Sequence, residues 1–220
     1  MNWSTSTGGG SARRTLASTD TLGSSDIVED TRQFFTVDIV RRIALHRRLS
    51  CDSVERGIGP ALSFLLAALA KLAARPLGAG ILSCAVARQY PATLETIRNG
   101  IGSESQDVAA AYGSGYMAHL VGANVFATAC TDIARSSGLG DQEAKLLVGL
   151  VGWVLMSQLR LQQRRQELSP SGLAYLLGCN STKNSEDRRG RKEWRPTAIT
   201  PARASFSRRI TAPRPCWPES

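Results

Sequence analysis

The sequence predicts an all-α fold, a helical bundle built from two related multi-helix units with disordered N- and C-terminal tails. The apolar runs in the middle of the chain are rich in Leu and Ala and recur at helical spacing. No stretch shows the apolar–polar alternation or the β-branched enrichment of a strand. A long internal repeat is the third observation, and it predicts that the bundle has two related parts.

The repeat joins residues 43–69 to residues 133–159, ninety positions later in the chain. The shared positions are apolar residues or Gly, which are the residues that helix packing requires. They are Ile43/Ile133, Ala44/Ala134, Leu49/Leu139, Gly59/Gly149, Leu65/Leu155 and Leu69/Leu159. The two units are expected at about residues 35–90 and 125–180.

Composition and charge divide the chain into three segments. Residues 1–30 are rich in Ser, Thr and Gly, carry a net charge of −2, and are expected to form a disordered leader. Residues 31–180, at +5, are expected to form the helical domain. Residues 181–220, at +6, are rich in Arg, Pro and Ser without any period, and are expected to form a disordered basic tail. Much of the excess positive charge therefore lies outside the domain.

The first helix is expected over residues 31–48, where apolar side chains recur at helical spacing up to a basic cluster that suits the negative end of a helix dipole. The next helix begins at Ser50 or Asp52, both good N-terminal caps. We expect it to be interrupted at residues 57–60, because Pro60 can begin a helix but is costly inside one.

Residues 61–74 are apolar almost all round, which indicates a helix in the centre of a bundle. A short apolar helix follows over residues 81–88, after a break that contains Pro and Gly. Another short helix is expected to start at Pro91 and to end at Gly100, since Pro suits the first position of a helix and Gly its end.

Residues 102–116 are interpreted as a polar loop followed by a stretch of small residues. Residues 117–135 then form a helix, because apolar residues approximate one face. Gly138 is expected to end this helix, as Gly adopts the left-handed conformation that commonly closes helices.

The second copy of the repeat predicts another apolar helix over residues 144–159. Its Gly149 and Gly152 lie three positions apart, so we expect a neighbouring helix to approach closely there. A serine followed by Pro170 indicates the start of a last short helix, which is expected to end at Gly178.

No residue pattern indicates catalysis, a cofactor or a metal site. The five cysteines are odd in number and far apart, and they are expected to be buried thiols in a reducing compartment such as the cytoplasm. Of the two histidines, His46 lies beside two arginines, and His119 is expected to be hydrogen-bonded or half-buried on an apolar helix. Ser114 lies between two glycines but lacks the preceding strand of a nucleophile elbow. We therefore expect a non-enzymatic protein.

A membrane-associated protein that uses the apolar segments 61–87 and 146–159 is one alternative. The uninterrupted apolar runs span about 11 residues, whereas a membrane-spanning helix needs about 20. Lys71 and Arg75 lie inside the first segment, where they would be costly in a bilayer. Buried core helices are therefore the favoured interpretation.

Nucleic-acid binding through the basic tail is the other alternative. The tail interleaves cations with aromatic side chains, a combination used by proteins that bind single strands. The candidate interaction residues are Arg188, Arg189, Arg191, Lys192, Trp194 and Arg195.

A family resemblance adds to this interpretation. SSGLGDQEAKLLVGLVGWVLM, followed by SPSGLAYLL, resembles the bacterial domain-of-unknown-function 937 (DUF937) family, to which the YidB-like proteins belong. The resemblance covers about residues 35–180. It implies an all-helical fold and no established activity. The expected function is an interaction or scaffolding module in the bacterial cytoplasm, which binds an unidentified protein partner or a second copy of itself.

Overall fold

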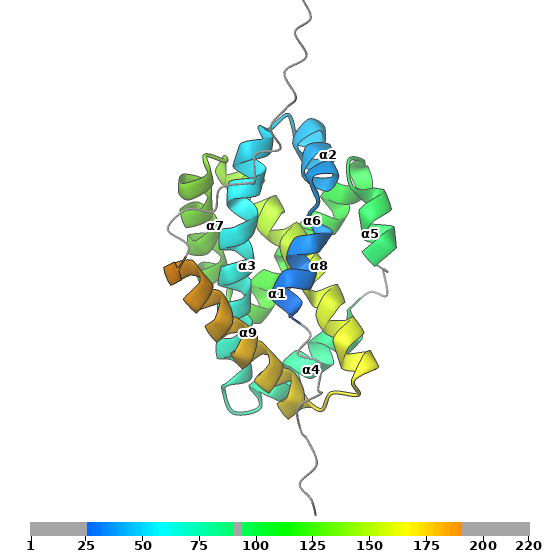
Figure 1. Cartoon of the computed structure of the whole chain (residues 1–220), viewed down its shortest axis with the longest axis vertical. Helices are drawn as coiled ribbons and strands as arrows, with labels where there is room; N and C mark the ends of the chain where they lie inside the picture. Colours follow the sequence, from blue (N-terminus) through cyan, green and yellow to red (C-terminus); the bar gives the residue numbers. More distant parts are fainter. Residues whose placement is uncertain (1–25, 90–93, 191–220) are drawn as a thin grey trace, which may run out of the picture.

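The structure, a computed structural model, describes residues 26–89 and 94–190, with side chains up to residue 182. Within these ranges the chain forms nine α-helices and no β-strand (Figure 1), so the predicted all-α class is confirmed. The helices are α1 (Ile27–Phe34), α2 (Val37–Arg47), α3 (Cys51–Ala73), α4 (Gly78–Arg88), α5 (Leu94–Gly100), α6 (Glu104–Val121), α7 (Ala123–Ser137), α8 (Asp141–Arg165) and α9 (Pro170–Gly190).

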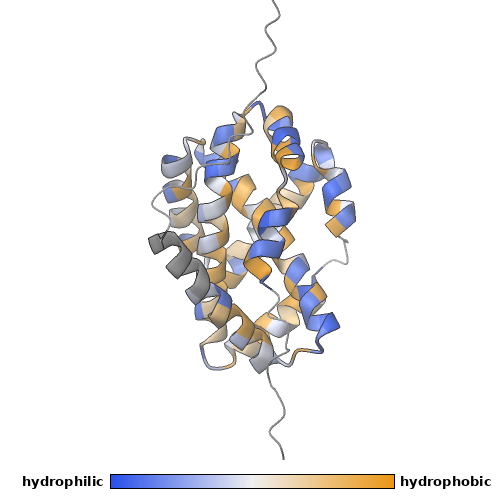
Figure 2. Cartoon of the chain, in the orientation of Figure 1, coloured by the Kyte–Doolittle hydropathy of each residue, from blue (hydrophilic) through white to orange (hydrophobic). Residues whose placement is uncertain are grey.

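Helix α8 is the centre of the bundle. It packs against α1, α3, α4, α5, α6 and α7, and every residue from Leu147 to Leu159 is buried. A helix that is apolar on all faces belongs in a protein core or a membrane, and here other helices surround it. The predicted apolar helix over residues 144–159 is confirmed. Figure 2 shows the complementary pattern, with hydrophilic residues on α1, α2, α5 and the end of α8.

Helix α1 extends the folded region beyond the predicted boundary at residue 31. The Asp26 carboxylate accepts hydrogen bonds from the backbone N–H of Val28 and Glu29 and caps the helix. Ile27 is completely buried. Residues 27–30 therefore belong to the helical body, and the expected leader falls on residues 1–25, which lie outside the described residues.

The single helix expected over residues 31–48 is wrong, because the chain breaks between α1 and α2. Thr36 supplies the reason, since its Oγ1 accepts a hydrogen bond from Ile39 N at 3.4 Å and begins a new helix. Phe34 and Phe35, at the break, pack edge to face with ring centroids 5.3 Å apart. The burial of the two rings and the Thr36 cap therefore favour a break, although the apolar residues continue at helical spacing through it.

Helix α3 runs through Pro60 without interruption, so the expected break at residues 57–60 is wrong. Ser50 caps the helix as predicted, with its Oγ accepting from Ser53 N at 3.0 Å. A proline inside a helix costs about 3 kcal/mol. The buried residues continue along one face on both sides of the proline, and this packing offsets the cost. They include Val54, Ile58, Ala61, Leu62, Leu65, Leu66 and Leu69.

Helix α6 contains most of the segment that was expected to be a loop and a small-residue stretch. The helix expected over residues 117–135 is divided at Gly122, whose φ of 100° lies outside the range of an α-helix. Its first part is the end of α6 and its second part is α7. The predicted end at Gly138 is confirmed, with φ of 74°.

The two copies of the repeat have the same turn between their helices. Each first helix ends on a left-handed residue, with φ of 56° in the α2–α3 turn and 74° in the α7–α8 turn. The leucine that follows donates its N–H to an alanine carbonyl, from Leu49 to Ala44 at 2.8 Å and from Leu139 to Ala134 at 3.2 Å. The repeat therefore describes a shared helix–turn–helix. The wider division into two related units is not confirmed.

Helix α9 begins at Pro170 as predicted, and Ser169 Oγ caps it by accepting from Gly172 N at 3.2 Å. It continues to Gly190, so the expected end at Gly178 is wrong. The tail expected from residue 181 thus begins with helical backbone. α9 packs against α3 and α4.

Candidate interaction site

Three aromatic side chains form a cluster on α6 and α8, which we call the aromatic cluster: Tyr112, Tyr116 and Trp153. The rings of Tyr112 and Tyr116 are stacked with centroids 6.0 Å apart. Tyr112 meets Trp153 edge to face at 4.7 Å. Tyr112 is 47% exposed and Trp153 only 8%. The cluster therefore presents the exposed ring of Tyr112 beside the partly buried Tyr116 and the buried Trp153.

A close approach of α6 to α8 brings the cluster together. A side chain added at Gly113 would collide with the carbonyl of Gly149, and one added at Gly152 would lie 2.7 Å from Met117 Cγ. The expectation that Gly149 and Gly152 admit a neighbouring helix is confirmed, and that helix is α6. Ser114 is buried at this crossing, and its hydroxyl donates to Lys145 O of α8 at 2.9 Å.

Hydrogen bonds fix the base of the cluster. The Tyr116 hydroxyl donates to Ala85 O of α4 at 2.7 Å, and burial raises the pKa of Tyr116, with Tyr112 adding to the shift. Gln89 Nε2 donates to Trp153 O at 3.2 Å. The Tyr116 hydroxyl thus stays protonated at neutral pH and holds α6 against α4. The cluster therefore lies on α6 and α8 and is hydrogen-bonded to α4.

Sequence interpretation missed this cluster. Tyr112 and Tyr116 are four residues apart, a spacing that places both rings on one face of a helix. That signal was hidden because residues 102–116 were interpreted as a loop and a small-residue stretch. Trp153 lies in a helix expected to be buried all round, and only the α6–α8 crossing places its edge beside Tyr112.

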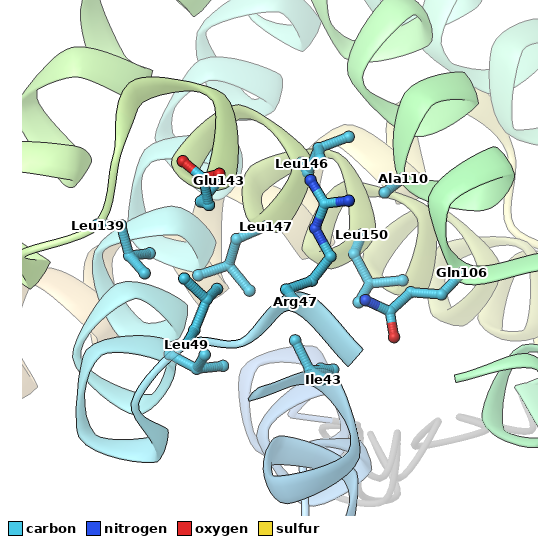
Figure 3. Close-up of a pocket in the computed structure, with 11 residues that line it drawn as sticks. Ile43, Arg47, Leu49, Gln106, Ala110, Leu139, Glu143, Leu146, Leu147 and Leu150 are labelled. Atoms are coloured by element: carbon cyan, nitrogen blue, oxygen red, sulfur yellow. The ribbon is translucent and has the colours of Figure 1, made fainter. Parts of the chain in front are cut away.

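A small pocket lies where the two repeated turns meet (Figure 3). Leu49 and Leu139, the matching leucines of the two turns, both line it, and so do the charged residues Arg47 and Glu143. Its volume is about 20 Å³. That is space for about one water molecule, whereas sites for small organic ligands start at roughly 300 Å³. The pocket is therefore a packing gap between the turns.

One of the two histidines contacts a carboxylate on another helix, and the other is exposed. His46 Nε2 lies 3.2 Å from Asp107 Oδ2, and Arg47 contacts the same carboxylate at 3.4 Å, so both tie α2 to α6. His119 is exposed, and the expectation that it is half-buried is wrong. Among the residues that the structure describes, no group of three His, Cys, Asp or Glu side chains is arranged to hold a metal ion.

The cysteines differ in their exposure to solvent. Cys51 and Cys84 are exposed, so the expectation of buried thiols is wrong for them. Cys130 is buried as expected, and burial raises the pKa of its thiol to about 11. Cys179 is partly buried, and Cys216 lies outside the described residues.

Cys51 and Cys84 should therefore react with iodoacetamide at pH 8 at least about a hundredfold faster than Cys130. With a pKa of about 11, Cys130 is almost entirely protonated at that pH, and only the thiolate reacts. Peptide mass spectrometry of the native protein over a time course measures each rate. Labelling in denaturant, where all thiols are accessible, is the control, and equal native rates would contradict the assigned burial.

The structure leaves the predicted tail site untested. Arg188 and Arg189 lie in the last turn of α9, but their side chains are outside the described residues. Arg191, Lys192, Trp194 and Arg195 lie entirely outside them. Nucleic-acid binding by these residues stays a prediction.

Two of the described helices, α3 and α8, have the length and hydropathy that crossing a bilayer requires, with 23 and 25 residues. They are longer than the runs of about 11 uncharged residues seen in the sequence, because the helices continue through charged residues at their ends. Core helices pass the same test. In the most apolar window, 78% of α8 and 50% of α3 is buried within the protein.

Comparison with known proteins gives one match. The family model described as a bacterial protein of unknown function, DUF937, matches residues 31–162, from α1 to near the end of α8. No curated protein and no solved structure matches the chain. The match covers more than half of the chain and agrees with the resemblance noted in its sequence. The chain belongs to the DUF937 family of bacterial proteins.

Proposed function

We propose that this protein is a non-enzymatic helical module of the bacterial cytoplasm that binds a protein partner, or a second copy of itself, through the aromatic cluster. The observation that carries the proposal is the placement of Tyr112, which is 47% exposed above a Trp153 that is 8% exposed. Tyrosine and tryptophan are enriched among the residues that contribute most to protein interfaces.

The cluster is already rigid before a partner arrives. Tyr112 is held against Tyr116 and Trp153, and Tyr116 is hydrogen-bonded to α4. A side chain that is ordered in the free protein loses little conformational entropy on binding. Contacts between a partner and the exposed part of the Tyr112 ring would therefore add to affinity with little entropic cost.

The exposed positions of α6 near Tyr112 are uncharged, although the partly exposed Asp107 lies next to Val108. Between Glu104 and His119, the exposed positions of α6 carry no charge. They are Ser105, Val108, Ala111, Tyr112 and Gly115. Val108, one helical turn before Tyr112, is 70% exposed. An aromatic residue beside an exposed valine and small residues is typical of the centre of an interface, where charged residues are depleted.

Site-specific photo-crosslinking in the bacterial host tests the proposal. A benzophenone amino acid at position 108 leaves the aromatic cluster intact and should give a defined cross-linked product. Tyr112→Ala in the same chain should lower its yield at least about tenfold, since interface tyrosines often contribute about 2 kcal/mol. The same probe at Thr131, an exposed position of α7, is the matched control and should give no such product.

The mass of the cross-linked product shows whether the partner is a second copy of the chain or another protein. The Tyr112→Ala variant should melt cooperatively by circular dichroism, which shows that any loss is not unfolding. A product at position 108 that is insensitive to Tyr112→Ala, or no product at all, would contradict the proposed function.

A further inference from the structure

Helix α4 has an exposed stripe that does not belong to the aromatic cluster. It consists of Leu77, Ile81, Cys84 and Arg88, at intervals of four, three and four residues that place them on one face of the helix. Leu77 is 85% exposed and Ile81 is 53% exposed. The opposite face is buried against the body. The apolar half of this stripe is therefore held outward on a fixed helix.

Several contacts make α4 a rigid support. Ser83 Oγ accepts a hydrogen bond from Gln163 Nε2 of α8 at 2.8 Å, and Ala85 O accepts one from Tyr116 of α6. Leu77, at the start of the helix, has φ of 62°, which a leucine seldom adopts. Its neighbour Gly78 donates to Arg75 O at 2.9 Å and fixes the turn. The turn thus presents a leucine to solvent at the tip of the body.

Basic residues outnumber acidic ones near the stripe, although Glu167 and Asp30, which lies 3.5 Å from Gln162 Nε2, are also at the end of α8. From residue 57 to residue 94 the chain contains Lys71, Arg75 and Arg88 and no acidic residue. The end of α8 adds Arg164 and Arg165, next to the Gln163 that contacts Ser83 of α4. All five cations are exposed, and Glu167 is the acidic residue that follows them. Figure 1 shows α4 at one end of the body, near the end of α8.

We propose that this end of the protein docks on an anionic membrane surface. Leu77 and Ile81 enter the interfacial region, while Lys71, Arg75, Arg88, Arg164 and Arg165 contact lipid headgroups. Exposed aliphatic residues together with exposed cations on the neighbouring elements combine the two interactions that peripheral membrane binding requires. The proposal does not rest on the aromatic cluster or on the proposed protein partner.

A lipid surface fits these residues better than a nucleic acid. Single-stranded nucleic acids bind cationic grooves that also offer aromatic rings for base stacking. The exposed apolar side chains here are aliphatic, which suits acyl chains. The contact is peripheral, because α8 is enclosed by its neighbours and cannot enter a bilayer without unfolding the core.

Vesicle co-sedimentation of the full chain tests the proposal. The probe is a vesicle of phosphatidylcholine and phosphatidylglycerol in equal parts, and pure phosphatidylcholine vesicles are the reference. We expect binding at least about tenfold weaker to the neutral vesicles, since cations near an anionic surface each add to affinity. High salt should also weaken binding to the anionic vesicles.

The decisive variant is Leu77→Asn with Ile81→Gln, which removes the apolar side chains. Asn tolerates the left-handed backbone of position 77, so this variant is expected to fold. Its affinity for the anionic vesicles should fall at least about tenfold. The matched control is Val125→Gln on α7, because Val125 is 54% exposed, close to the 53% of Ile81. Its affinity should not change.

Charge reversal gives a second comparison. Arg75→Glu should weaken binding several-fold, whereas Arg41→Glu on α2 changes the net charge equally and should have little effect. A probe that shifts its fluorescence in an apolar environment, attached through Leu77→Cys in a Cys51→Ser/Cys84→Ser/Cys179→Ser/Cys216→Ser background, should respond to anionic vesicles. The same probe at position 125 should not.

Three results would overturn the proposal. The first is the absence of binding to the anionic vesicles. The second is equal binding by the Leu77→Asn/Ile81→Gln variant and the Val125→Gln control, which would assign vesicle binding to other cations of the chain. The third is retention of single-stranded DNA that depends on Arg75 but not on Leu77, without vesicle binding, which would assign the surface to nucleic acid.

Discussion

Gly113→Ala is expected to lower the free energy of unfolding by roughly 1–3 kcal/mol, the usual range for overpacking a core. The added Cβ would lie 2.9 Å from Gly149 C and closer still to Gly149 O. Those are backbone atoms of α8, so no side-chain rotation can relieve the collision. α6 and α8 must separate, and the packing along the crossing is weakened.

The matched control for this change is Gly115→Ala in the same helix. Gly115 is exposed, and an added Cβ there would meet no atom within 4 Å. Because alanine favours helix over glycine, this variant should be more stable by up to about 1 kcal/mol. Urea unfolding measures both. The two substitutions should have opposite signs, and a similar gain in both would contradict the close approach of α6 and α8.

Leu155→Ala is expected to destabilise the protein by about 2–5 kcal/mol, the range observed when a buried leucine is truncated. Leu155 is completely buried in the middle of α8. Removing its side chain loses buried apolar surface and leaves a cavity that helices on several sides cannot all close. Leu45→Ala on α2 is the control, because Leu45 is 69% exposed and its loss should change stability by less than about 0.5 kcal/mol.

The repeat allows a further check on this prediction. Leu65 in α3 occupies the position that matches Leu155, and it is also completely buried. Leu65→Ala should therefore cost about as much as Leu155→Ala in the same urea titration. A cost below about 1 kcal/mol for Leu65→Ala alone would show that the matched positions do not share a packing role.

Local signals in the sequence predicted the ends of several helices correctly. Ser50, Gly138 and Pro170 all act as expected, because capping and left-handed closure depend on a few neighbouring residues. Such interactions are decided within one turn of helix. For that reason they can be recognised without knowledge of the fold.

Predictions that depended on packing failed where distant contacts outweighed local preference. Pro60 lies inside α3 because buried residues on both sides keep the helix intact. The segment before Met117 is helical because its small residues let α6 pack closely on α8. Seen alone, proline predicts a break and a run of Gly and Ala predicts a loop. The compensating contacts come from residues far away in the sequence.

The candidate site was beyond prediction for the same reason. Tyr112 and Trp153 are 41 positions apart, and only the α6–α8 crossing brings their rings together. The sequence predicts only some features of the exposed stripe of α4. The absence of acidic residues is visible in the sequence, but the outward direction of Leu77 depends on the left-handed turn.

The central place of α8 has a consequence for how the chain is made. The ribosome synthesises α1 to α7 before α8, so the surfaces of α3 and α6 that face α8 stay uncovered while the first 140 residues emerge. The core closes only after residue 165 has left the exit tunnel. Until α8 has emerged, the nascent chain therefore exposes apolar faces of α3 and α6, the kind of surface that makes incompletely folded chains prone to aggregate.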